Sequence, residues 1–162
     1  MNRISLIITT LVLSLVLGCA SESKESPKAN YSVETLRQDL AKSAKKGHKG
    51  IPEIVRVLEE NMETHYAVFS STAINLSVKH LHELAQQGIY TDEVLPVLVR
   101  AIKKQLAIND TLQTAKAIKL LSGVEVGYTE EFVNSYQVND EPEWLAKIAV
   151  WEDYVESLQL NY

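Results

Sequence analysis

The chain has 162 residues, a formal net charge of −5 and a hydrophobic share of 46%. Its acids are concentrated near the C-terminus, because residues 124–162 carry nine acidic side chains and one lysine. This segment is unsuited to nucleic acid or anionic lipid, and it indicates either a solvated helical surface or a contact with a basic partner. Glycine and proline are scarce and no stretch alternates between apolar and polar residues, so we expect an all-α protein.

The N-terminal residues have the pattern of an export signal. An uncharged apolar run over residues 4–17 is shorter than the about 20 residues that a membrane-spanning helix needs. Residues 15–19, with the sequence Leu-Val-Leu-Gly-Cys, resemble the lipobox of bacterial lipoproteins. The resemblance implies that residues 1–18 are a signal peptide, that cleavage falls between Gly18 and Cys19, and that Cys19 carries a lipid. The alternatives are an uncleaved anchor and an ordinary signal cut elsewhere.

Cysteine usage and the residues after the lipobox agree with this interpretation. A lone thiol in an exported protein cannot form an internal disulfide, and lipid attachment accounts for it. Ala20 is similar to the residue that follows the cysteine in lipoproteins of the Gram-negative outer membrane, which implies a cell-envelope location facing the periplasm. Residues 19–31 are small and polar, so they predict a flexible tether of about 20 Å before a helical domain over residues 32–160.

About seven helices are expected from the apolar periodicity and from the residues that begin and end helices. In chain order they cover residues 33–46, 52–62 and 67–87, a helix from Thr91, a helix between the break at 109–111 and Gly123, and residues 130–136 and 142–158. Three starts share a tyrosine before Ser or Thr, in Tyr31-Ser32, Tyr90-Thr91 and Tyr128-Thr129. We expect each hydroxyl to cap its helix and each tyrosine to pack on the apolar residue five positions later.

Two of the predicted helices carry the same apolar stripe. Ile51, Ile54, Val55, Leu58 and Met62 recur 44 positions later as Leu95, Leu98, Val99, Ile102 and Leu106, and Arg56 recurs as Arg100. A stripe repeated at this period predicts stacked helical hairpins. Over residues 50–123 the chain resembles HEAT repeats, most closely at residues 95–98, Leu-Pro-Val-Leu, and at residues 110–123. The resemblance implies a short right-handed stack of antiparallel helical hairpins, a HEAT-like α-solenoid, that binds proteins and has no catalytic residues.

Two features concern how individual helices fit this stack. Pro96 is expected in the second turn of the fourth helix, where it would remove a backbone hydrogen bond and cause a kink or a broken first turn. The last helix has its apolar residues on one side, which is typical of a helix that closes the open end of a stack. Those residues are Trp144, Ile148, Trp151, Val155 and Leu158.

Four lysines gather at the end of the first predicted helix, namely Lys42, Lys45, Lys46 and Lys49. Cations at a helix C-terminus suit the helix dipole, and the alternative is a contact with a protein partner or with lipid headgroups. We treat the four lysines as candidate partner-binding residues.

No combination of residues predicts a catalytic group, a cofactor or a metal site. His80 and His82 are two positions apart on a predicted helix, so they point to different sides and cannot share an ion. The chain has no nucleophile elbow and no phosphate-binding loop motif. We therefore expect a lipid-anchored, non-catalytic adaptor or scaffold that binds an unidentified protein. The first alternative is an immunity-type lipoprotein that neutralises a periplasmic toxin, and the second is a small envelope hydrolase.

Overall fold

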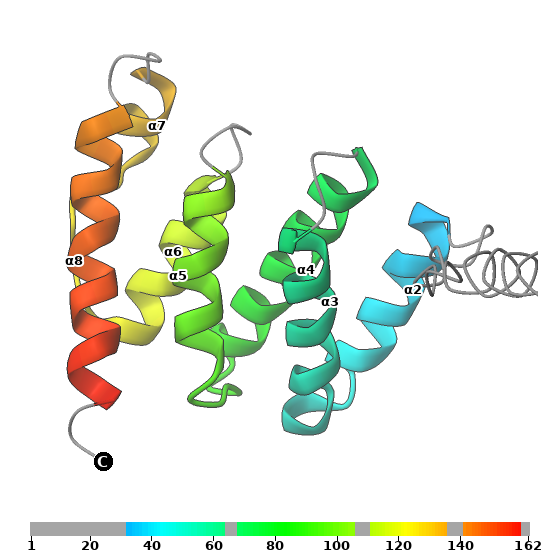
Figure 1. Cartoon of the computed structure of the whole chain (residues 1–162). Coiled ribbons are helices and arrows are strands. Elements are labelled where there is room, and N and C mark those ends of the chain that lie inside the picture. Colours follow the sequence, from blue (N-terminus) through cyan, green and yellow to red (C-terminus); the bar gives the residue numbers. More distant parts are fainter. Residues whose placement is uncertain (1–31, 64–67, 106–110, 136–140, 160–162) are drawn as a thin grey trace, which may run out of the picture. The chain divides into compact units, whose positions relative to one another are not determined.

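The computed structural model describes residues 32–63, 68–105, 111–135 and 141–159 (Figure 1). The predicted signal peptide and tether, with Gly18 and Cys19, lie outside these residues. The described residues form seven α-helices and one short 3₁₀ helix and contain no strand, which confirms the all-α prediction. The elements are α2 (Val33–Ala44), η1 (Gly47–Gly50), α3 (Ile51–Glu63), α4 (Val68–Gln86), α5 (Val94–Gln105), α6 (Thr111–Ser122), α7 (Glu130–Ser135) and α8 (Glu141–Gln159).

The start of α5 differs from the prediction. The helix begins at Val94 instead of Thr91, and the Val94 amide donates to the Thr91 carbonyl at 3.0 Å in the turn that precedes it. Pro96 is therefore the third residue of the helix, where an amide has no acceptor within the helix. The prediction placed Pro96 one turn too far inside, and the proline removes no helical hydrogen bond at its actual position.

Hydroxyl caps hold two of the three predicted helix starts. The Ser32 and Thr129 hydroxyls each accept a hydrogen bond from the amide three residues later, at 3.1 and 3.2 Å, which confirms both caps. The Thr91 cap is wrong, because the Thr91 hydroxyl contacts the Glu93 carboxylate at 3.2 Å, ahead of the helix. Tyr90 is 50% exposed, and Tyr31 lies outside the described residues.

The helices pack in two layers (Figure 1). Helices adjacent in sequence pair as α3 with α4 and α5 with α6. Alternate helices also pack on one another, so that α2, α4 and α6 form one layer and α3, α5 and α8 form the other. The helices α3, α4, α5 and α6 therefore each have neighbours on two sides. Together these neighbours cover the wide apolar stripe of an amphipathic helix.

The repeated apolar stripe lies in the interior between these layers. The members with no exposed surface are Ile51, Ile54, Leu58, Leu98 and Ile102. Met62 is partly buried against the same core, and Leu106 lies outside the described residues. Because a fully buried Leu or Ile side chain contributes about 1.5–3 kcal/mol, the stripe is a large part of what holds α3 and α5 in place.

One polar side chain crosses the core at the end of α5. Gln105 is 1% exposed, and its amide nitrogen donates to Asn75 Oδ1 of α4 at 2.9 Å. Its amide oxygen accepts from the buried Thr114 hydroxyl of α6 at 2.5 Å. Gln105 thus joins three helices through two hydrogen bonds, which replace the hydrogen bonds to water that its side chain loses on burial.

Aromatic side chains close the C-terminal end of the domain. Tyr128, Phe132, Trp144 and Trp151 form a cluster with ring centroids 4.9 to 5.8 Å apart. The Trp151 indole nitrogen also donates to the Val124 carbonyl at 3.1 Å, which attaches α8 to the segment after α6. The cluster covers the apolar surface at the end of the stack, where the described residues contain no further helical hairpin.

The buried part of α8 ends earlier in the sequence than predicted. Trp144, Ile148 and Trp151 are buried as expected, and Val155 packs against the core. Leu158 is 41% exposed, because it lies in the final turn, past the last residue of α8 that the core covers.

Candidate functional site

An open groove of about 630 Å³ runs along the exposed sides of α3, α5 and α8. Three cations of α5 line it, with acids of α3 on one side and an acid of α8 on the other, because α5 packs between those two helices. We call this feature the charged groove; it is lined by Glu59, Met62, Glu63, Arg100, Lys103, Lys104 and Glu152.

Ion pairs cross the charged groove from helix to helix. Arg100 of α5 pairs with Glu59 of α3, and Lys103 Nζ lies 2.9 Å from Glu152 Oε1 of α8. All four side chains are substantially exposed, and such surface pairs contribute about 0–1 kcal/mol each. The pairs therefore organise the charges of the groove without fixing them strongly, so that an incoming charged segment can compete for them.

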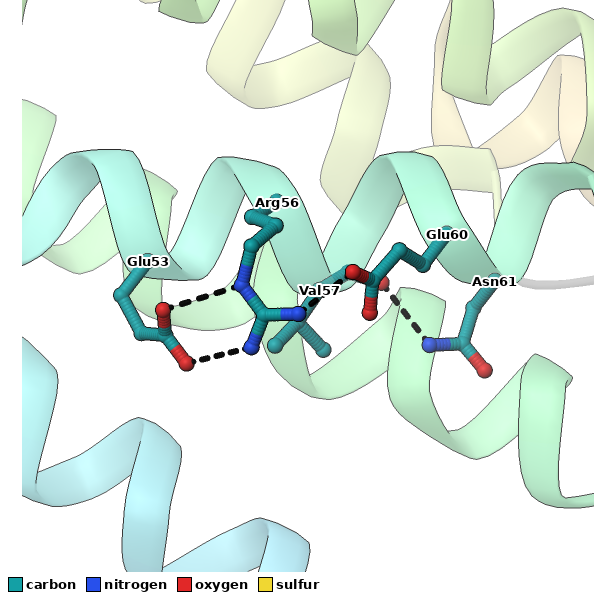
Figure 2. A network of polar contacts seen from close by, with 5 residues as sticks. All are labelled: Glu53, Arg56, Val57, Glu60 and Asn61. Atoms are coloured by element: carbon teal, nitrogen blue, oxygen red, sulfur yellow. Dashed lines mark hydrogen bonds and ion pairs between the residues drawn. The ribbon is translucent and has the colours of Figure 1, made fainter. Parts of the chain in front are cut away.

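A second network lies on the outer side of α3 (Figure 2). Arg56 donates to both carboxylate oxygens of Glu53, at 3.1 and 2.7 Å, and it also pairs with Glu60. The Asn61 amide donates to the Val57 carbonyl at 2.8 Å within the same helix (Figure 2). The hydrogen bonds that Arg56 donates lower the pKa of Glu53, and the same bonds to the Glu53 and Glu60 carboxylates raise the pKa of Arg56.

The two arginines of the repeat form different pairs for a physical reason. Arg100 reaches an acid on the preceding helix of its layer. Arg56 lies on α3, which is the first helix of that layer in the described part of the chain, so it pairs with acids on its own helix, at i−3 and i+4. Equivalent positions in a repeat thus produce an internal network at one end of the layer and a cross-helix link in the middle.

The four predicted lysines form a second charged surface, which we call the basic patch. Lys42 lies in the last turn of α2, Lys45 and Lys46 follow it, and Lys49 lies in η1. All four side chains are exposed, and none forms an ion pair with another described residue. The structure therefore brings the predicted residues together around one corner of the domain.

A smaller hollow of about 420 Å³ lies between α6, the segment at residues 125–130 and Trp151. Lys119 of α6 pairs with Glu125 at this hollow. Its lining surface is mainly apolar. The hollow could not be expected from the sequence, because its walls come from three helices and an irregular segment.

The histidines have separate surroundings. His80 Nδ1 lies 3.3 Å from Glu83 Oε2, whereas His82 Nδ1 lies 3.4 Å from the Gln113 amide of α6. Burial, with a further contribution from the Lys116 charge, lowers the pKa of His82. Within the described ranges, no group of three or more His, Cys, Asp or Glu side chains is placed to hold a metal ion. No helix in those ranges is long and apolar enough to cross a membrane.

Comparison of the chain with known protein families, with curated proteins and with solved structures gives no match. The four lysines were predicted as a group from the sequence, whereas the charged groove, which is assembled from three helices, was not predicted. The repeated arginine, Arg56 and Arg100, was the available signal, because a charged residue at equivalent positions of a repeat lies on the same exposed side of each helix.

Proposed function

We propose that the chain is a bacterial lipoprotein, anchored through Cys19, whose helical domain acts as a non-catalytic adaptor for another protein in the cell envelope. The lipobox-like residues 15–19 support the anchor, and Ala20 supports a place on the periplasmic side of the outer membrane. The observation that carries the binding role is the charged groove, because it is an open surface built from successive helices of one layer.

We further propose that the domain is a short HEAT-like solenoid. Two observations support this: α3 with α4 and α5 with α6 form consecutive pairs, and equivalent helices of the two pairs pack on each other. The repeated stripe residues occupy the same interior in both pairs. In such a stack each unit adds one helix to each layer, so a binding surface extends over several units.

The charges of the groove define the partner surface that would fit it. Cations at Arg100, Lys103 and Lys104 lie between acids of α3 and α8. A complementary segment would present carboxylates towards α5 and basic side chains towards Glu63 and Glu152. It could also place an apolar side chain against Met62, which is partly buried in the groove floor.

The anchor is tested by changing Cys19→Ser. Several acyl chains on one cysteine hold a protein firmly, because each buried methylene contributes about 0.8 kcal/mol. We expect the variant to lose palmitate labelling and to move from the membrane fraction to the soluble fraction. Retention of label and of membrane association would contradict the anchor.

The binding role is tested by capture from chemically crosslinked envelopes. The variant Lys103→Glu with Lys104→Glu reverses two charges of the groove, and Lys79→Glu with Lys116→Glu reverses two charges on the other layer as a matched control. We expect a specific protein to be recovered with the wild type and the control and lost with the groove variant. Equal recovery with all three proteins, or no specific protein with the wild type, would count against the proposal.

A further inference from the structure

The basic patch contains four of the six described lysines and arginines that form no ion pair. The described lysines and arginines that form ion pairs are Arg37, Arg56, Lys79, Arg100, Lys103, Lys119 and Lys147. Outside the patch, Lys104 and Lys116 are the described cations without such a pair, and they lie on separate helices. Four neighbouring cations without ion pairs are thus confined to one corner of a chain whose net charge is negative.

Glu53 of α3, whose pKa is lowered in part by Lys46, does not neutralise this patch. Glu53 lies close enough to Lys46 for the lysine charge to contribute to its lowered pKa. Both Glu53 oxygens are nevertheless bound by Arg56, which is the larger cause of the shift (Figure 2). The Glu53 charge is therefore balanced mainly by Arg56 within α3.

We propose that the basic patch binds the headgroups of anionic phospholipids and so holds the domain against the bilayer. This inference rests on the proposed anchor, because lipid on Cys19 would keep a membrane within reach. Cys19 and Ser32 are 13 positions apart, a length of chain that can reach at most about 45 Å, and the 12 residues of α2 place the patch about 18 Å beyond Ser32. The chain after Cys19 is therefore long enough for the patch to reach the membrane surface.

The charge distribution along the domain favours one orientation at an anionic surface. α2 packs on α3 and α4 near the start of the described chain, whereas α8 packs on α5. The patch at the end of α2 would be attracted to such a surface, and the acids of residues 124–162 would be repelled. Near a bilayer each lysine strengthens binding by about fivefold, and the attraction is lost within a Debye length of about 10 Å at moderate salt.

Vesicle binding tests the inference without the lipid anchor. The full mature chain with Cys19→Ser is sedimented with phosphatidylcholine vesicles, with or without one third of phosphatidylglycerol. The patch variant carries Lys42→Gln, Lys45→Gln and Lys49→Gln, and the matched control carries Lys79→Gln, Lys116→Gln and Lys119→Gln. Circular dichroism checks that all three proteins are equally helical.

We expect the wild type and the control to bind only the vesicles with phosphatidylglycerol, and this binding to weaken as salt is added. The patch variant should bind about 100-fold more weakly, because three lysines are removed. Equal binding to both vesicle types, or equal losses in the patch and control variants, would overturn the inference. Tighter binding to a soluble polyglutamate peptide than to the vesicles would overturn it too, because the patch would then fit an acidic protein.

The outcomes separate this inference from the proposed function. Failure to bind vesicles, together with intact palmitate labelling and partner capture, would remove the membrane role of the patch alone. Vesicle binding by a chain that is never lipidated in cells would leave the patch as a membrane contact and remove the anchor.

Discussion

The hydrogen bonds of Gln105 allow a sharp test of how the three central helices are joined. Gln105→Leu keeps the size of the side chain but removes its two bonds, to Asn75 of α4 and Thr114 of α6. Asn75 is only partly buried and can turn to water. Thr114 has no exposed surface, so its hydroxyl would be left without a partner.

The expected cost follows from this difference. An orphaned buried hydroxyl costs about 1–3 kcal/mol, and the added apolar surface of leucine offsets part of that cost. We expect Gln105→Leu to lower the free energy of unfolding by about 2 kcal/mol, against a total of about 5–15 kcal/mol for a typical domain. Thr114→Val should also destabilise, because it leaves the Gln105 carbonyl without its donor. The double variant should be less destabilised than the sum by about 1 kcal/mol, because neither partner is then orphaned.

Urea unfolding of the mature Cys19→Ser chain, followed by circular dichroism, measures these free energies. The four proteins of the double-mutant cycle must unfold with the same dependence on urea concentration for the comparison to hold. The role of the buried hydrogen bonds would be refuted if Gln105→Leu were as stable as the wild type. It would also be refuted if the two single losses of unfolding free energy added fully in the double variant.

Three further outcomes are expected from the same unfolding assay. Gly50→Ala should destabilise by about 1–3 kcal/mol, because a Cβ there would lie 1.8 Å from the Ser43 carbonyl oxygen; an unchanged midpoint would contradict this. Leu98→Ala should cost about 3 kcal/mol, whereas Val150→Ala, at a 47% exposed position, should change stability by less than about 0.5 kcal/mol. The pKa of His82 is lowered in the folded chain, so His82 becomes protonated at a higher pH in the unfolded chain than in the folded one. The free energy of unfolding should therefore fall as the pH drops below about 6.5. His82→Gln should reduce this fall, and identical pH profiles of the variant and the wild type would contradict the expectation.

Local patterns were sufficient to predict the helices and their buried sides. The stripe that includes Ile54 and Leu98 has helical spacing, and a buried side of that kind is dictated by the hydrophobic effect along one element. The caps at Ser32 and Thr129 were predictable because they join atoms three residues apart. Thr91 failed as a cap because the helix it would have capped begins at Val94.

The missed features depend on contacts between distant parts of the chain. Gln105 is a polar residue at the end of a helix, where an exposed side chain would be expected. It is buried because α4 and α6 lie on either side of it. The charged groove likewise requires Glu59 and Glu152 to meet the cations of α5 from two other helices. Sequence spacing within one helix contains no information on such pairs, so they could not be found until the helices were placed.

Site-specific photocrosslinking in cells tests the central claim most directly, which is that one layer of the helical domain binds a partner protein. A photoreactive residue is placed at Lys104 in the charged groove and, as the matched control, at Lys116 on the exposed side of α6. We expect a discrete crosslinked protein from position 104 and none from position 116. No crosslinked protein at 104, or the same products from both positions, would contradict it.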